Sequence, residues 1–225
     1  MKAYFIKRFT SSSFQSAGPV VCYTTGSRQF LYRVGADIIR PFLRGRAVYC
    51  GRVIPAPTLQ TQKGTVPMIF DIHTHTFPDK IAPSTIQKLQ SMSHTAAFSD
   101  GTEGGLRDSM DRAGIDGCLV LPVATSARQV VHVNDASARL NDRGPETGLW
   151  SFGCMHPDFD GWREELARVA ALGMKGVKLH PIYQGVDFDD LRYLRILDRC
   201  GELGLAVLTH AGRDIGFPDR DHCTP

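Results

Sequence analysis

Two histidines lie two residues apart in the segment 70–76, FDIHTHT. They follow a short apolar run that begins at Met68, and this run predicts a β-strand. On a strand, residues i and i+2 point to the same face, so the imidazoles of His73 and His75 can meet at one point. Imidazole nitrogen is a ligand for zinc and related metals. The pair therefore predicts two ligands of one divalent ion, against the alternative of two polar side chains where a strand leaves the core.

A third histidine, His210, ends the apolar run 206–210 and is followed by the small residues Ala211 and Gly212. Small residues at this point would leave the space beside the ring open. Three histidine nitrogens leave the fourth position of a tetrahedral ion for water or substrate, as a catalytic metal requires. We predict His210 as the third ligand. The alternative is a buried histidine that is hydrogen-bonded to the backbone.

Lys178 and His180 also lie two residues apart, in the run 176–181, GVKLHP, and share one strand face. A lysine that points into a core is costly unless it is paired. Lys178 could polarise a substrate carbonyl, hold a carboxylate or bind metal after carboxylation, or its stem could follow the rim with the amine in water. His180 could bind metal, shuttle a proton or anchor a water. We predict both as catalytic residues.

Other polar side chains near these runs carry weaker expectations. His156 and Asp158 follow a further apolar run and could line the same opening, although a loop turn explains them equally well. Arg213 and Asp214 follow His210 and could meet an acidic substrate, with a surface ion pair as the alternative. His132 falls in a helical pattern and is expected to face solvent.

These candidates lie at the ends of elements that alternate regularly from Met68 onward. Short, nearly continuous apolar runs are typical of strands in a parallel sheet that helices cover. The predicted strands are 68–73, 117–122, 149–155, 176–180 and 206–210. The predicted helices are 83–92, 105–113, 126–141, 162–172 and 191–203, with Gly114, Gly173 and Gly204 as the residues that end three of them.

Five β/α units in order predict an α/β fold, either a (β/α)8 barrel or a doubly wound sheet. Histidines at the ends of the first, fourth and fifth strands favour the barrel, because barrel sites are built from the C-terminal ends of several strands. A dinucleotide-binding sheet would need G-x-G-x-x-G after a strand, and the sequence has none. The expected fold is an incomplete (β/α)8 TIM-type barrel.

Residues 1–67 differ in composition from the rest. They hold ten Lys or Arg and a single acid, Asp37, a charge of +9, whereas residues 68–225 hold 16 basic and 22 acidic residues, a charge of −6. No sustained period runs through 1–67, so we expect an irregular basic extension before a barrel domain at 68–225. Translation upstream of a true start at Met68 is favoured over a targeting segment and over a nucleic-acid arm.

Composition excludes several classes of protein. No stretch approaches the roughly 18–20 apolar residues of a membrane span. Six cysteines without paired spacing predict free thiols in a reducing compartment, the cytoplasm, or an organelle if residues 1–67 are a transit peptide. We expect a small-molecule substrate and neither nucleic acid nor membrane as a partner. The sequence does not predict the oligomeric state.

Three motifs in order, DIHTHTFPDK at 71–80, GVKLHP at 176–181 and LTHAG at 208–212, resemble the amidohydrolase-related family of the amidohydrolase superfamily. This branch includes aminocarboxymuconate semialdehyde decarboxylase, and the resemblance covers residues 68–225. It implies a distorted (β/α)8 barrel with one or two divalent ions, zinc being the expected one. It also implies His73 and His75 as strand-one ligands, His210 as the strand-five ligand, and Lys178 at a position that some members carboxylate.

The resemblance implies a metal-dependent hydrolase, in which the ion lowers the pKa of water towards ~7 and hydroxide attacks a carbonyl, amide or ester-type bond of a small substrate. Non-oxidative decarboxylation of a carboxylated substrate is the first alternative, and an inactive metal-binding fragment is the second. The family pattern continues with a strand-six histidine and a strand-eight aspartate. Because the sequence ends at Pro225 after the fifth strand, we expect a C-terminally truncated fragment with exposed sheet edges.

Overall fold

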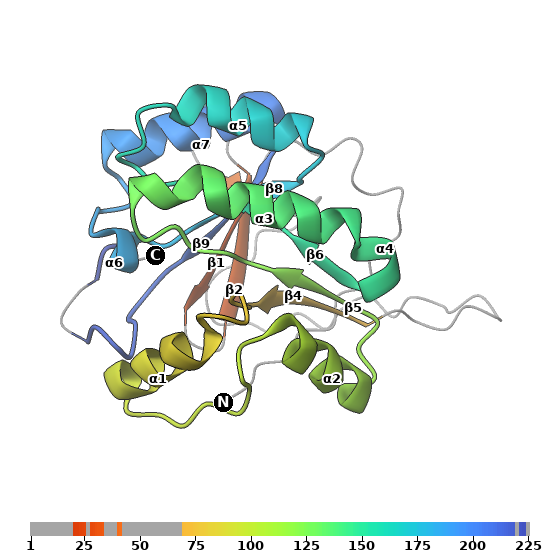
Figure 1. The fold of residues 1–225 in the computed structure, drawn as a ribbon. Helices are drawn as coiled ribbons and strands as arrows, with labels where there is room; N and C mark the ends of the chain where they lie inside the picture. Colours follow the sequence, from red (N-terminus) through yellow and green to blue (C-terminus); the bar gives the residue numbers. More distant parts are fainter. Residues whose placement is uncertain (1–19, 26–27, 34–39, 42–68, 219–220, 224–225) are drawn as a thin grey trace.

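The computed structural model describes residues 69–218 and 221–223 in full, and the backbone alone of residues 20–25, 28–33 and 40–41 (Figure 1). Met68, the first residue of the first expected strand, lies outside these ranges. Within them strands and helices alternate, with α3, α5 and α7 along one side of the strands and α1 and α2 along the other (Figure 1). No helix in this part of the chain is long and apolar enough to cross a membrane.

The five expected strands are present, with the third divided in two. The strands are β4 (Phe70–Thr74), β5 (Gly117–Val120), β6 (Leu149–Ser151), β7 (Gly153–Cys154), β8 (Gly176–Leu179) and β9 (Ala206–His210). Every pairing among them is parallel, with β4-β5-β6 in one sheet and β7-β8-β9 in another. Their side chains are mostly buried, as the continuous apolar runs predict.

The third strand divides because helix α3 supplies side chains that replace strand partners. Asn141 Oδ1 accepts from the Ser151 N–H at 2.6 Å, and Asn134 Oδ1 accepts from the Cys154 N–H at 2.7 Å. Between them, the Phe152 N–H donates to the Val120 carbonyl at 3.1 Å. The chain therefore passes from one sheet to the other at Phe152, although its sequence is one apolar run.

The five expected helices are confirmed with shifted ends. They are α1 (Ala82–Ser93), α2 (Glu103–Ala113), α3 (Val130–Asp142), α5 (Trp162–Ala171) and α7 (Leu191–Leu203), and a 3-10 turn, η2 (Ala127–Gln129), precedes α3. Gly114 and Gly204 end α2 and α7 with φ of 64° and 68°, a conformation that glycine adopts without strain. Two four-residue helices, α4 (Gly144–Thr147) and α6 (Pro181–Gln184), are too short for sequence periodicity to predict.

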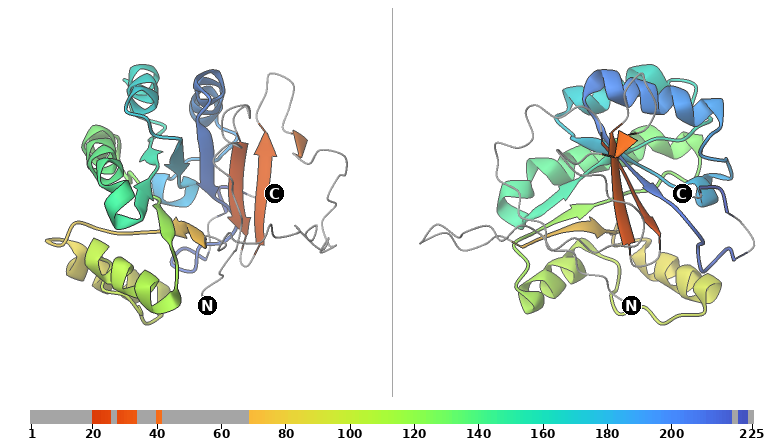
Figure 2. Two further views of the ribbon diagram at one scale, coloured as in Figure 1. Left: turned by 90° about the vertical axis from the view of Figure 1, so that its right-hand side faces the viewer. Right: turned by 180° about the vertical axis from the view of Figure 1, so that it is seen from behind.

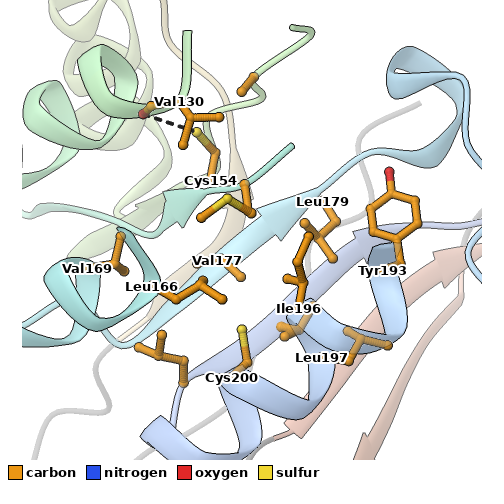
Figure 3. Close-up of a cluster of buried hydrophobic side chains, with 14 of the residues drawn as sticks. Val130, Cys154, Leu166, Val169, Val177, Leu179, Tyr193, Ile196, Leu197 and Cys200 are labelled. Carbon is orange, nitrogen blue, oxygen red and sulfur yellow. Dashed lines mark hydrogen bonds between the residues drawn. The ribbon is translucent and has the colours of Figure 1, made fainter. Parts of the chain in front are cut away.

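The main hydrophobic core lies where α3, α5 and α7 cover β7, β8 and β9 (Figure 3). Apolar residues at helical spacing put one face of each helix into this core. On α7 this face carries Tyr193, Ile196, Leu197 and Cys200, and on α5 it carries Leu166 and Val169. A smaller cluster of Met110, Cys118, Val120, Leu140 and Leu149 lies around β5 and β6.

The expectation that residues 1–67 are irregular is wrong for part of that segment. Strand β1 (Val20–Thr25) pairs antiparallel with β2 (Arg28–Arg33), which pairs with β3 (Arg40–Pro41). Strand β1 also pairs parallel with β9, so that this hairpin extends the sheet beside β9 (Figure 2). The sequence signals for this hairpin are the β propensity of VVCYTT and RQFLYR and the two residues between them, Gly26-Ser27. Our expectation had relied instead on the lack of hydrophobic periodicity in this segment.

The described strands form an open, partial barrel rather than a closed one. Their order is β4-β5-β6 in one sheet and β3-β2-β1-β9-β8-β7 in the other. The α/β class and the parallel units agree with the sequence prediction. The edge of β9, however, which we expected to be exposed, is covered by β1.

Candidate metal centre

The two histidines at the end of β4 face each other. Their Nε2 atoms are 3.1 Å apart, and the rings meet edge to face at 62°. The Thr74 hydroxyl between them points the other way and donates to the Leu119 carbonyl at 2.9 Å, which holds the strand end on β5. The His73 N–H donates to Asp71 Oδ1 at 3.0 Å. Alternation along the strand thus brings both imidazoles to one point, as the spacing predicts.

The hydrogen bond at the far side of the His75 ring fixes which nitrogen is available. His75 Nδ1 lies 2.8 Å from the Leu121 carbonyl oxygen. Because a carbonyl only accepts, the ring proton belongs on Nδ1 and Nε2 keeps its lone pair. Metal-binding histidines are commonly oriented by such a bond from the second nitrogen. Nε2 of His75 is therefore an acceptor, and it faces Nε2 of His73.

His210, at the end of β9, has a buried nitrogen that no described residue satisfies. Its Nε2 has no hydrogen-bond partner among the described residues, and Asp214 Oδ2 lies 3.9 Å away, beyond hydrogen-bond distance. A buried polar atom without a partner is destabilising. A cation bound at this nitrogen would supply the missing interaction, so this residue also fits a metal.

His180, His210 and Asp214 form a second group, whose candidate ligand atoms all lie within 4.8 Å of one another. The rings of His180 and His210 stack at 4.3 Å and 8°. The Tyr183 peptide N–H donates to His180 Nδ1 at 3.4 Å, which leaves the proton of a neutral His180 on Nε2. His180 Nε2, 3.9 Å from Asp214 Oδ2, is thus a donor in this arrangement rather than a free lone pair.

Asp214 is held in place from two sides. The Gly216 N–H donates to its Oδ1 at 2.8 Å, and the Tyr183 hydroxyl is hydrogen-bonded to the same carboxylate. Burial, together with the charge of Asp214, raises the pKa of Tyr183 to about 12. The Tyr183 ring stacks on His180 at 3.9 Å, so that one residue supports both groups. The carboxylate faces the histidines with its position fixed.

Sequence reasoning placed Asp214 with Arg213 and left both as a substrate contact or a surface pair. The structure separates them: the Arg213 side chain is 76% exposed and lies 3.8 Å from Asp221, whereas the Asp214 side chain is 11% exposed. The surface alternative therefore describes Arg213, and Asp214 belongs to the histidine cluster. The sequence did hold a signal for the role of Asp214, because this carboxylate follows the candidate ligand His210 by four residues, in the loop after a strand.

The Lys178 side chain does not reach the surface. The residue is 1% exposed on β8, which excludes a position along the rim. Its positive charge lowers the pKa of all four histidines, His73, His75, His180 and His210. The ammonium group thus acts electrostatically on histidines at the ends of β4, β8 and β9.

Burial is the largest cause of the lowered histidine pKa values. It holds the pKa of His73 at about 2, of His75 at about 4 and of His180 at about 2, with smaller contributions from neighbouring charges. His75 remains accessible to solvent on one side, although the surrounding protein is dense enough for desolvation to dominate its pKa. Neutral imidazole is the form that binds metal, so the cluster is in the binding form at neutral pH.

The other candidates from the sequence lie in local contacts. The buried His156 accepts through Nδ1 from the Asp158 N–H at 3.2 Å, and the Asp158 carboxylate pairs with Arg192 at 2.6 Å. These contacts agree with the loop turn that the sequence allowed. His132 is exposed on α3, as expected.

A comparison with known protein families found a match over the part of the chain that contains the candidate site. A family model described as Amidohydrolase matches residues 70–224, well over half of the chain. The chain belongs to the amidohydrolase family. The matched range begins at the first residue of β4. It includes all six residues described above as parts of the candidate site, namely His73, His75, Lys178, His180, His210 and Asp214.

Several solved structures are similar to this chain at low identity. A mutant 5-carboxyvanillate decarboxylase from Novosphingobium aromaticivorans, solved with manganese and 3-methoxy-4-hydroxy-5-nitrobenzoic acid, is 16% identical with a TM-score of 0.49, over 64% of this chain and 51% of that one. A protein assigned as a 2-pyrone-4,6-dicarboxylic acid hydrolase from Acinetobacter baumannii, with citric acid bound, is 18% identical with a TM-score of 0.42, over 63% and 49%.

A protein assigned as an amidohydrolase from Staphylococcus aureus is 14% identical with a TM-score of 0.46, over 64% of this chain and 47% of that one. This chain thus spans about half the length of the structures that it matches. No curated protein matches it.

Proposed function

We propose that the protein is a metal-dependent hydrolase that cleaves a carbonyl, amide or ester-type bond of a small substrate. The observation that carries this proposal is two groups of neutral histidines at strand ends. His73 and His75 have Nε2 atoms 3.1 Å apart, and the candidate ligand atoms of His180, His210 and Asp214 lie within 4.8 Å of one another. His75 offers Nε2 with its proton fixed on Nδ1, and the buried Nε2 of His210 has no partner among the described residues. Membership of the amidohydrolase family supports the same reading.

In this proposal His73, His75 and His210 hold the ion, and Asp214 supplies a carboxylate beside His210. Three imidazoles with one carboxylate suit zinc and other divalent transition metals, and we expect zinc. Such an ion, when bound, polarises a substrate carbonyl and makes water a better nucleophile at neutral pH. Members of the donor set come from β4, β9 and the loop after β9, so the ion would join the two sheets.

The remaining polar groups have distinct roles in the proposal. Asp214 accepts the proton of the attacking water, because its Oδ2 faces the cluster while Oδ1 is held by Gly216. His180 donates a hydrogen bond from Nε2 to a substrate oxygen, since its Nδ1 accepts from the Tyr183 N–H. Lys178 stabilises negative charge on that substrate through its buried ammonium group.

Non-oxidative decarboxylation is the second candidate, and Lys178 is the observation that favours it. The buried positive charge of Lys178, which lowers the pKa of the neighbouring histidines, would also attract a substrate carboxylate. A substrate carboxylate at this position would be held for loss of carbon dioxide rather than for hydrolysis. A screen of aromatic and aliphatic carboxylates that measures carbon dioxide release separates the two reactions, because hydrolysis releases none.

The experiment that tests the proposal measures metal binding and turnover on the same preparation. The chelator-treated chain is titrated with zinc against a chromophoric competitor, and then assayed on a panel of small esters, amides and lactones. We expect one tight zinc site that His210→Ala weakens and that His132→Ala leaves unchanged, with turnover that requires the metal. Zinc retention without turnover of any substrate in this panel would contradict the hydrolase. If no carboxylate released carbon dioxide either, the result would identify a non-catalytic metal-binding protein.

We also propose a cytoplasmic location. The four cysteines among the described residues, Cys118, Cys154, Cys200 and Cys223, are free and buried. Free thiols persist in a reducing compartment. Fluorescence of a C-terminal fusion in intact cells, compared with organelle markers, tests this location.

A further inference from the structure

The side chain of Gln184, the last residue of α6, makes four hydrogen bonds in a buried position. Its Oε1 accepts from the His180 N–H at 3.1 Å and from the Tyr193 hydroxyl at 2.5 Å. Its Nε2 donates to the Ala124 carbonyl at 2.8 Å and to the Met155 carbonyl at 2.7 Å. These four bonds use the whole capacity of a side-chain amide, which has two donor hydrogens and two acceptor lone pairs.

The partners leave no ambiguity in how this amide is oriented. The two carbonyls can only accept, and the His180 N–H can only donate. If the amide oxygen and nitrogen were exchanged, its oxygen would face two carbonyl oxygens and its NH2 group would face a peptide N–H. The amide oxygen of Gln184 therefore faces His180 and Tyr193.

The bonds of Gln184 connect segments that are distant in the sequence. Ala124 follows β5, Met155 follows β7 and His180 follows β8, so the amide ties together three connections that leave the C-terminal ends of strands. Tyr193, which is fully buried on α7, fixes the amide from the helix side. This is the end of the sheets where His75 and His210 also lie.

Gln184 makes hydrogen bonds to both the N–H and the carbonyl of His180. Besides the bond from the His180 N–H to its side chain, the Gln184 N–H donates to the His180 carbonyl at 3.0 Å. With the backbone fixed in this way, the His180 ring lies between the rings of Tyr183 and His210. Loss of the Gln184 amide would release the His180 N–H and leave two buried carbonyls without partners.

We propose that Gln184 is a positioning residue that fixes the direction of the His180 imidazole toward Asp214. The proposal rests on the function proposed for His180, because only then does this direction matter for chemistry. Gln184 does not touch the reacting atoms in this arrangement. It acts through the backbone of His180 and through the two neighbouring strand connections.

The test observes the His180 ring directly and needs no metal or substrate. In the metal-free chain labelled with 15N, we compare the ring nitrogen signals of His180 in the wild type and in Gln184→Met, which keeps the size of the side chain. We expect the His180 signals to move or broaden in the variant, with faster hydrogen exchange of the His180 N–H. The signals of the exposed His132 should not change.

Asn134→Leu is the matched control. Asn134 is a fully buried amide that also bonds backbone groups, the N–H and the carbonyl of Cys154, together with Glu165, but it lies on the α3 side of β7. We expect this variant to lower the melting temperature without moving the His180 ring signals. Equal movement of those signals in both variants would overturn the positioning role, since general destabilisation would then explain it.

A milder variant keeps the test decisive if Gln184→Met does not fold. Tyr193→Phe removes the single bond from the hydroxyl to Oε1 and leaves the other three. We expect the His180 signals to move in the same direction by a smaller amount. Unchanged signals in a folded Gln184→Met, or in Tyr193→Phe if the first variant fails to fold, would overturn the proposal. Because no metal is present, absence of zinc binding in the wild type would count against the proposed function alone.

Discussion

The histidines at the end of β4 are less deeply buried than most of the residues at the ends of β8 and β9. At the end of β4, His75 is open to solvent on one side and His73 is half-buried. At the ends of β8 and β9, Lys178, His180 and Thr209 are all buried, and the His180 ring is stacked between two others. The β8–β9 half of the candidate site is therefore more deeply buried, and the β4 half lies at the edge of the three-stranded sheet.

The packing behind the two strand ends explains this difference. The core under β7, β8 and β9 joins three helices, and α5 packs directly on α7. The cluster around β5 and β6 has five buried members. Since stability follows buried apolar area, the β8–β9 end is held by more of it. The affinity for a metal with ligands from both ends would therefore depend on the position of the β4 end, which has less apolar packing behind it.

The largest effect we expect is the loss of stability when a buried leucine is truncated in each of the two hydrophobic clusters. Leu166→Ala should lower the free energy of unfolding by about 4 kcal/mol, because the surrounding strands and helices cannot collapse into the cavity. Leu149→Ala, in the small cluster, should cost about 3 kcal/mol, since fewer neighbours resist relaxation. Urea unfolding of both variants measures the difference. A larger loss for Leu149→Ala would reverse the ranking of the two halves.

Removal of one histidine from each half should affect zinc binding unequally. His210→Ala should weaken binding by about a thousandfold, or about 4 kcal/mol, because the lost nitrogen is buried, where water does not readily replace it. His75→Ala should weaken it by about a hundredfold, since water can enter at the solvent-open side and occupy the position. Competition titrations with His132→Ala as control measure both values. Equal losses would show that the two ends are equally rigid.

Acid should destabilise the metal-free chain through the buried histidines. The pKa of His180 is about 2 in the folded chain, against about 6.5 in the unfolded chain. Below pH 6.5 the unfolded chain binds a proton that the folded chain excludes, so the free energy of unfolding decreases as the pH falls from about 6.5. Each such group contributes up to about 1.4 kcal/mol per pH unit.

A substitution tests this pH dependence. His180→Gln should make the decrease in stability between pH 6.5 and pH 5 shallower than in the wild type. Urea unfolding of both chains at several pH values in the presence of chelator measures the two slopes. An unchanged slope in His180→Gln would show that this ring is protonated in the folded chain.

Local sequence patterns predict much of this molecule. The alternation of apolar runs predicts the five β/α units from β4 to β9, and Gly114 and Gly204 predict the ends of two helices. The H-x-H spacing predicts that His73 and His75 converge. Each of these features depends on residues within one or two turns or on strand alternation, which a sequence displays directly.

Features that depend on tertiary contacts are not visible in the sequence. The third strand divides because Asn134 and Asn141 of α3 take over its backbone hydrogen bonds. Asp214 joins the histidines because the loop after β9 turns back, and Gln184 matters because its partners include a carbonyl sixty positions away in the chain.

The smallest effect should show whether the two halves unfold together. Thr102 caps α2, which lies on the β4 side, and its Oγ1 accepts from the Gly105 N–H at 2.9 Å. Thr102→Ala should cost about 1 kcal/mol, and Thr102→Ser, which keeps the hydroxyl, should cost less. If α2 opens independently of the main core, hydrogen exchange will accelerate in α2 and leave β8 and β9 unchanged. Acceleration of equal size in all three elements would instead show one cooperative unit, and the two halves of the site would then not differ in local stability.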